Sequence, residues 1–261
     1  MATVQAAEAF RNLGMSKSTM LQLASCVRLG HFAAGDTLLV ASRPLEYCSY
    51  VVSGLISPSM PGPDGADMAL SLNGAGTFLG VGTVLTTGIP GTSWVCQSEV
   101  SALLIPVADT LRAFETDAGF ARHAARTLAL HNTRHLEMYK TWRGAYSDLR
   151  VVLSLARIAV LLGDDDALTL LGDDAVGIPL TQSVLASLCG MSRSVFSGFL
   201  QQLVQADWVS ADYGSLRLLN LSSWRALHHG RYRAPAPNGR GVDMQAVIAW
   251  MGQFRRLPAP V

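Results

Sequence analysis

LTQSVLASLCGMSRSVFSGFLQQLVQADWVSADYGSLRLL, residues 180–219, is the stretch of the chain with the most specific pattern. Thr181 is placed to cap a first helix, because its hydroxyl can accept from a free amide of the first turn. Val184, Leu185 and Leu188 give that helix one apolar face. Gly190 then ends it, since glycine adopts a left-handed backbone at little steric cost.

A second helix follows directly. Ser192 is predicted to cap it, and apolar residues at helical spacing are predicted to bury it on the first helix: Val195, Phe196, Phe199, Leu200 and Leu203. Beyond it, Trp208-Val209 and Leu216 to Leu219 flank a turn-rich cluster at 212–215, which is typical of a β-hairpin. Two helices, a tight turn and a hairpin predict a winged helix-turn-helix.

These residues resemble the C-terminal domain of the Crp/Fnr family of bacterial transcription regulators. The resemblance rests on the Thr-Gln opening at 181, Ala186, Gly190, the Ser192-Arg193 pair, the run from Leu200 to Leu203, and the hairpin. It implies that the second helix enters the DNA major groove.

The same resemblance implies which residues contact DNA. Contacts to base edges are expected from Ser192, Arg193, Ser194 and Ser197, and contacts to phosphates from Thr181 and Gln182. Arginine suits this role because it bonds the N7 and O6 acceptors of guanine. The sequence departs from the family where Ser194 and Gly198 replace charged readers, so no known target sequence carries over. The alternative is a helical hairpin with no nucleic-acid role.

The N-terminal half has a different pattern. Residues 4–29 are predicted to be helical, and residues 27–105 form short β-rich runs separated by glycines, as in a sandwich or barrel. HFAAGD at 31–36 and YVVSGLI at 50–56 resemble the start of the cyclic-nucleotide-binding β-roll of the same family. The predicted fold class is therefore α+β: an N-terminal double-stranded, jelly-roll-like β-roll, a long dimerisation helix and a C-terminal winged helix-turn-helix.

The stretch FLGVGTVLTTGIPGTSWVCQ, residues 78–97, stands where family members carry a phosphate cassette. The resemblance implies a glutamate at 81 and an arginine about ten residues later, but position 81 is valine and no arginine occurs between Arg43 and Arg112. A buried phosphate without a cationic partner is costly, so control by a cyclic nucleotide in the family manner is not expected. A pocket for another effector would include Phe78, Gly80, Val81, Thr92, Ser93, Trp94 and His135. The alternative is a closed β-roll that binds no ligand.

A long helix is predicted from about residue 117 to 143. Apolar and small residues recur at alternating spacings of three and four, which predicts a coiled-coil seam and a partner helix: Ala121, Ala124, Leu128, His131, His135, Met138 and Trp142. The family pairs this helix across a two-fold axis, so we predict a homodimer on a palindromic DNA site.

His131 and His135 lie one helical turn apart, a spacing that suits a metal or a haem shared with a partner. A haem- or metal-based sensor is therefore an alternative, although Glu137 is the only nearby carboxylate. The four cysteines are scattered and predict buried thiols rather than a zinc or iron-sulfur site. Our primary prediction includes no cofactor and no metal.

Composition agrees with a folded regulator. The chain has 261 residues, of which 49% are hydrophobic and 15% charged, with a net charge of +1. No apolar run reaches the roughly 18 residues of a membrane helix, and no signal peptide is evident, so a cytoplasmic location without membrane contact is expected. No catalytic motif occurs, so no enzyme activity is expected.

The sequence thus predicts a DNA-binding transcription regulator that a cyclic nucleotide does not control in the family manner. An alternative is a regulator that needs no effector of any kind. The protein's expected partners are double-stranded DNA and a second copy, with RNA polymerase and an unknown small molecule as further candidates. The predicted parts are a β-roll sensor at 1–116, a dimerisation helix at 117–145, a winged helix-turn-helix at 146–229, and a linker with a helical tail at 230–261. The tail carries an apolar stripe that we expect to dock on the same chain.

Overall fold

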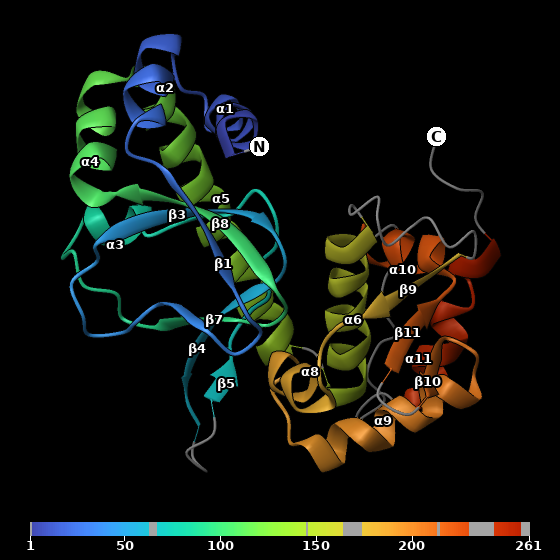
Figure 1. The fold of residues 1–261 in the computed structure, drawn as a ribbon. Helices are drawn as coiled ribbons and strands as arrows, with labels where there is room; N and C mark the ends of the chain where they lie inside the picture. Colours follow the sequence, from blue (N-terminus) through green and yellow to red (C-terminus); the bar gives the residue numbers. More distant parts are fainter. Residues whose placement is uncertain are drawn as a thin grey trace. The chain divides into compact units, whose positions relative to one another are not determined.

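A computed structural model describes residues 2–62, 67–144, 146–163, 174–212, 215–229 and 243–256. The chain divides into two compact units, Met1–Glu137 and Met138–Val261. Each unit has its own strands and helices (Figure 1).

The first unit contains two four-stranded antiparallel sheets. Their strands pair in the order β1 (Arg28–Phe32), β8 (Val100–Pro106), β3 (Tyr47–Ser53), β6 (Phe78–Leu79) in one sheet, and β2 (Thr37–Leu39), β7 (Ser93–Cys96), β4 (Ile56–Pro61), β5 (Asp67–Ala69) in the other. Strands adjacent in a sheet are mostly distant in sequence, as expected of a β-roll rather than a meander.

Successive side chains of a strand point to opposite faces of the sheet, so the first sheet contributes to two hydrophobic clusters. Val51 and Ala102 face the second sheet, whereas their neighbours Tyr50 and Leu103 face the helices. The inner cluster joins the two sheets through Leu39, Val51, Ile56, Leu79, Cys96, Val100 and Ala102.

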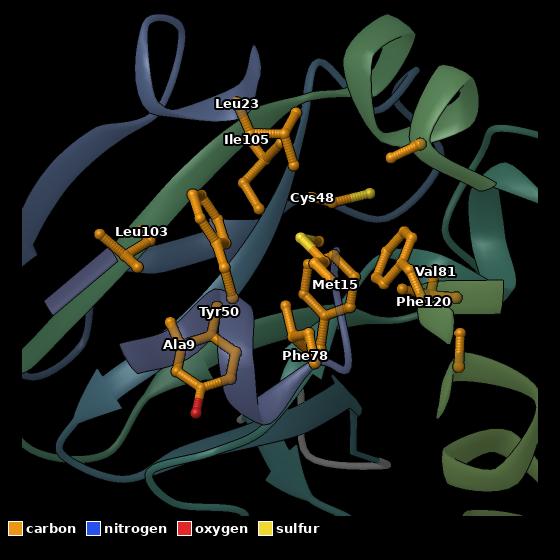
Figure 2. Close-up of a cluster of buried hydrophobic side chains, with 14 of the residues drawn as sticks. Ala9, Met15, Leu23, Cys48, Tyr50, Phe78, Val81, Leu103, Ile105 and Phe120 are labelled. Atoms are coloured by element: carbon orange, nitrogen blue, oxygen red, sulfur yellow. The ribbon is translucent and has the colours of Figure 1, made fainter. Parts of the chain in front are cut away.

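The outer cluster lies between the first sheet and the helices of this unit (Figure 2). Phe120 is central to it: its ring centroid is 5.8 Å from that of Phe78 and 4.7 Å from that of Phe114. The helices are α1 (Ala2–Asn12), α2 (Lys17–Ala24), α3 (Val81–Val84), α4 (Val107–Thr116) and the start of α5 (Ala118–Gly144). Helix α5 thus begins as part of the β-roll's own core.

The start of α5 is tied to the N-terminal helices by Asp117, which is buried. Its carboxylate accepts from the backbone amides of Ser16 at 2.8 Å, Gly119 at 3.0 Å and Phe120 at 3.1 Å. Burial alone raises the pKa of a carboxyl, but hydrogen bonds from Thr19, Ser16 and Phe120 outweigh it and hold the pKa of Asp117 well below its ordinary value. The ionised carboxylate therefore stabilises this junction.

The second unit packs helices around a three-stranded antiparallel sheet with the order β10, β11, β9. Its elements are α6 (Ser147–Gly163), β9 (Ala175–Ile178), α8 (Gln182–Leu188), α9 (Arg193–Gln205), β10 (Val209–Asp212), β11 (Ser215–Leu219), α10 (Leu221–His228), α11 (Met244–Met251) and the short 3-10 helix η1 (Phe254–Arg256). The hairpin β10–β11 is the predicted wing, and β9 extends it.

The predicted fold class is confirmed: an α+β chain with a β-roll, a long helix and a winged helix-turn-helix. The predicted coiled-coil seam is wrong for Ala124. This residue is only 3% exposed because it packs in the outer cluster, so it is not open to a partner helix. The side chains of His131, His135, Met138 and Trp142 lie outside the described residues. All four cysteines are free, and Cys48, Cys96 and Cys189 are buried as predicted, whereas Cys26 is half-buried.

Within the described residues, no single helix is long and apolar enough to span a membrane. Helices α8 and α9 reach the required length and composition only as a pair bent by 98°. Their apolar residues Leu185, Phe196 and Leu203 are each fully buried within the second unit.

Candidate nucleic-acid interface

The two helices of the motif begin at the predicted caps. The Thr181 hydroxyl accepts from the amide of Val184 at 3.3 Å, and the Ser192 hydroxyl accepts from the amide of Val195 at 3.4 Å. Each cap satisfies one of the amides that a helix start leaves free. The Ser192 hydroxyl also lies 3.1 Å from the hydroxyl of Ser194. Ser192 is therefore first a structural cap.

The turn between the helices is set by Gly190, whose φ is +66°. Few side chains tolerate this left-handed backbone, so glycine fixes the turn. Behind it, α8 and α9 pack through Leu185, Ala186, Phe196, Leu200 and Leu203, each no more than 3% exposed. This packing holds α9 on the domain and determines which of its faces remains open.

The open face of α9 carries small and amide side chains. Ser194, Gly198, Gln201 and Gln205 are exposed and recur at i, i+4, i+7 and i+11, which places them along one side of the helix. Arg193 is exposed at the start of this face. Amide and hydroxyl groups both donate and accept, so the face suits hydrogen bonding to base edges.

Gly198 lies in the middle of that face. A Cβ built there would meet no atom within 4 Å, and the backbone φ is not in the left-handed range. Neither packing nor backbone geometry within the second unit therefore requires glycine at this position. What its absent side chain provides is an open space on the surface of α9.

The predicted DNA-contacting residues lie around this face. Arg193 and Ser194 are exposed in the first turn of α9, and Ser197 is half-buried at its side. Thr181 is exposed and Gln182 half-buried at the start of α8. The structure thus gathers all six on the two helix starts and on α9, while Ser192 is committed to capping.

One sequence prediction about α9 was wrong and two residues were missed. The apolar spacing predicts that Val195 is buried, yet it is 47% exposed, because the buried arc is set by Phe196, Leu200 and Leu203. Gln201 and Gln205 also lie on the open face, although the resemblance implies no role for them. Their signal was present in the sequence as polar residues in register with Ser194.

A basic residue of α6 also lies near the turn. A Cβ on Gly190 would stand 3.7 Å from Nη1 of Arg150, whose other terminal nitrogen donates to the Ser147 hydroxyl at 3.2 Å. The guanidinium therefore adds positive charge close behind the turn. Its position depends on the packing of α6, which the local sequence pattern does not reveal.

The residues of the predicted effector pocket fall into separate groups. Phe78 and Val81 are buried in the outer cluster, whereas Trp94 packs on the inner cluster. Gly80 has a left-handed φ of +89°, and a Cβ there would stand 2.7 Å from Cδ2 of Leu45 and 3.3 Å from Sγ of Cys48, so Leu45 would have to shift. The remaining candidates are Thr92, half-buried, Ser93, whose hydroxyl accepts from the Ala41 amide at 3.1 Å, and His135, whose side chain lies outside the described residues.

Phe78 and Val81 thus pack on one face of the first sheet and Trp94 on the cluster at its other face. Burial raises the pKa of two nearby thiols, Cys48 and Cys96, to about 11 each, which keeps them protonated at neutral pH. In the part of the chain that is described, no group of three or more His, Cys, Asp or Glu side chains is arranged to hold a metal ion.

Comparison with known proteins agrees with this geometry. The family profile of the Crp-like helix-turn-helix domain matches residues 150–227, which span α6 to α10. A sequence comparison with curated proteins finds no match.

Solved structures of similar fold cover most of the chain. FixK2 from Bradyrhizobium japonicum is 18% identical, with a TM-score of 0.62 over 80% of this chain and 99% of that one. A Crp/Fnr-family transcriptional regulator from Thermus thermophilus is 20% identical, with a TM-score of 0.58 over 78% and 100%. The c-di-GMP responsive global regulator CLP of Xanthomonas campestris is 16% identical, with a TM-score of 0.59 over 78% and 99%.

The fold is thus that of the solved Crp/Fnr-type structures, with a cyclic-nucleotide-binding-like β-roll and a C-terminal winged helix-turn-helix. Residues 150–227 are a Crp-like helix-turn-helix domain, and the predicted resemblance of the chain to the Crp/Fnr family is confirmed.

Proposed function

We propose that the protein regulates transcription by binding a specific duplex DNA sequence, with α9 in the major groove. The observation that carries the proposal is the open face of α9, where Arg193, Ser194, Gly198 and Gln201 lie on a helix fixed by a cap and a tight turn. The side chains of Arg193, Ser194 and Gln201 can bond to the donors and acceptors that base pairs present in that groove. Thr181 and Gln182 are proposed to contact phosphates.

The small number of basic residues at the proposed interface supports specific rather than general binding. Counterion release grows with the number of phosphates that Lys and Arg contact, and Arg193 is the one basic residue among the six proposed contacts, so affinity for random DNA should be weak and only modestly salt-dependent. Most of the discrimination would then come from base contacts made by α9. This small number also favours a protein that leaves non-target DNA quickly.

A homodimer is the proposed binding form. Leu128 and Leu136 lie on one side of α5 and are 37% and 53% exposed, and Leu85, which follows α3, is 47% exposed. Leu128 belongs to the predicted seam, and Leu136 borders it one position after His135. Exposed leucines along one side of a long helix favour a partner helix that covers them. Two copies of α9 would then read half-sites about one helical turn, or roughly 34–36 Å, apart.

We further propose that no cyclic nucleotide controls the protein in the family manner. Val81, which stands in place of the expected glutamate, is 4% exposed and packs in the outer cluster. The position therefore contributes to the core and offers no oxygen to a ribose. The protein is proposed to bind DNA without an added effector, and to act on transcription through RNA polymerase.

The decisive experiment is selection of duplexes from a random DNA pool by the full chain at moderate salt, with no ligand added. We expect a palindrome with half-sites one helical turn apart. Arg193→Ala should lose about 1–3 kcal/mol of preference for the base pair it reads, as a lost bidentate contact does. Arg11→Ala, which removes an exposed arginine of α1, is the control.

Failure to enrich any sequence would contradict the proposal that the protein is competent without an effector. Unaltered base preference in Arg193→Ala would contradict the assignment of α9 as the recognition helix. Addition of cyclic AMP or c-di-GMP to the selection should leave the result unchanged.

A further inference from the structure

The segment at residues 243–256 folds onto the second unit as part of it. Asp243 caps α11 by accepting from the amide of Ala246 at 3.0 Å. The buried side of the segment consists of Met244, Val247, Trp250, Met251 and Phe254, each no more than 7% exposed. Helix α11 packs on α6 and α9, and η1 packs on α10.

Aromatic rings line the region where this segment lies. Trp250 and Phe254 meet edge to face with centroids 5.3 Å apart, and Trp208 and Trp224 do so at 5.4 Å. Trp208 is only 1% exposed although it follows α9 by three residues and opens the wing. Arg255 lies over this ring, with its guanidinium carbon 4.4 Å from the ring centre.

Arg255 also holds the backbone at the end of α9. Its Nη2 donates to the carbonyl of Ala206 at 3.0 Å and to that of Asp207 at 2.7 Å. The last carbonyls of a helix have no partner within the helix, and a cation there is favoured by the helix dipole. Asn220 donates to the same Asp207 carbonyl at 3.3 Å, so two side chains from outside the helix close this end.

The junction that Arg255 holds is short, and it lies between the two elements that are proposed to contact DNA. Only Ala206, Asp207 and Trp208 connect α9 to strand β10 of the wing. Asp207 has a left-handed φ of +55°, which an aspartate adopts only at some cost. The angle between the recognition helix and the wing depends on these three residues.

We propose that residues 243–256 are a clasp that fixes the angle between α9 and the wing, and that Arg255 is its positioning residue. This proposal rests on the proposed DNA-binding function. The angle affects DNA recognition only if both α9 and the wing face the duplex. The clasp belongs to the tail beyond the matched helix-turn-helix domain, which ends at residue 227. This chain would thus read DNA with a domain completed by its own extension.

A first experiment needs no DNA. Hydrogen exchange of amides at residues 203–212 is compared among the wild-type chain, Arg255→Ala and Arg256→Ala. Arg256→Ala is the matched control because it removes the same charge from the neighbouring position. We expect exchange at these amides to quicken about tenfold in Arg255→Ala alone, which is the effect of weakening the junction by about 1.4 kcal/mol. Equal exchange in the two variants would overturn the clasp.

A second experiment measures base discrimination. Binding of each variant to the selected duplex and to single-base changes of it is measured at two salt concentrations. Arg255→Ala should lose about tenfold in discrimination, whereas Arg256→Ala should change affinity equally for all duplexes. Arg255→Lys keeps the charge but not the planar stack, so it should retain the salt dependence and still lose discrimination.

The outcomes separate the two proposals. If wild-type protein binds no duplex selectively, the proposed function fails and the role of Arg255 in DNA reading fails with it, while the exchange experiment still decides whether Arg255 holds the junction. If wild-type protein is selective and Arg255→Ala is equally selective, the positioning role is overturned and the DNA-binding function stands.

Discussion

Gly198 separates stability from function at a single position. Alanine at this exposed site should raise the free energy of unfolding by about 0.5–1 kcal/mol, because glycine is the weaker helix former and a Cβ there meets no atom within 4 Å. The same methyl should lower DNA affinity by occupying the open space on α9. Thermal unfolding and duplex binding of Gly198→Ala measure both effects.

The matched control is Gly190→Ala. Its φ of +66° makes any side chain strained, so this variant should lose stability rather than gain it. A stabilised Gly198→Ala variant with unchanged binding would show that the open face of α9 does not approach DNA.

Asp117 gives the stability of the first unit a predictable pH dependence. Its pKa is lower in the folded chain than its ordinary value of 3.8, so the unfolded chain binds the proton more readily. The stabilisation is therefore fully present above about pH 4, and it is lost as the pH falls through the folded pKa.

Asp117→Asn should lower the free energy of unfolding at pH 7 by roughly 1.5–3 kcal/mol, the usual contribution of hydrogen bonds to a charged group. Its stability should also decline less than that of the wild type between pH 5 and 3. Urea unfolding across this range measures both. Asp109→Asn breaks the ion pair of the half-buried Asp109 with the exposed Arg112 and should change stability by less than about 1 kcal/mol. Parallel pH curves for wild type and Asp117→Asn would contradict the assignment.

At the scale of the element, α9 shows which structural features a local sequence pattern can predict. Its start, its cap at Ser192 and its buried residues Phe196, Leu200 and Leu203 were predictable because they depend on neighbours within two turns. The exposure of Val195 was not, since an apolar run alone does not say where the buried arc ends.

The β-roll shows a feature that a local sequence pattern cannot predict. Phe78 and Trp94 are close in sequence and were placed in one pocket, but they pack in different clusters on opposite faces of a sheet. Strand order decides that separation, and strand order comes from long-range pairing such as β8 with β1 and β3. No local pattern contains this information. The docking of Arg255 on Trp208 has the same origin, since 47 residues of chain do not set it by spacing alone.

The open face of α9 gives a prediction at this scale. Gln201 is exposed two turns beyond Ser194, and a glutamine amide can bond the N6 and N7 atoms of adenine. Gln201→Ala should reduce discrimination at one position of each half-site by about 1–3 kcal/mol and leave stability within about 0.5 kcal/mol. A competition assay with single-base changes measures the first, and thermal unfolding the second.

The control is Gln22→Ala, which removes an exposed glutamine from α2 of the first unit. Uniform loss of affinity for every duplex in Gln201→Ala would assign this residue to the phosphate backbone instead of to a base.

At the scale of the whole molecule, the exposed leucines of α5 predict an assembly state. Leu136→Glu places a charge on a side chain proposed to be covered in the dimer, where an unpaired charge is costly. The variant should sediment as a monomer in analytical ultracentrifugation at micromolar concentration, and its affinity for the palindrome should fall.

Leu21→Glu is the matched control, because Leu21 is 76% exposed on α2 of the same unit. It should leave sedimentation unchanged. A wild-type chain that already sediments as a monomer would contradict the proposed dimer, and the selected DNA should then contain single half-sites.

The clasp has a consequence for how the protein is made. Residues 243–256 leave the ribosome after every other element of the second unit, yet α11 packs on α6, the first of them. Until they arrive, the ring of Trp208 lacks its contact with Arg255 and the apolar residues that face α11 lack their partners, and apolar surface of this kind is what chaperones and proteases act on. An mRNA truncated after the codons for α10 would thus yield a chain that contains the whole helix-turn-helix but lacks the packing of α11 and η1 on it.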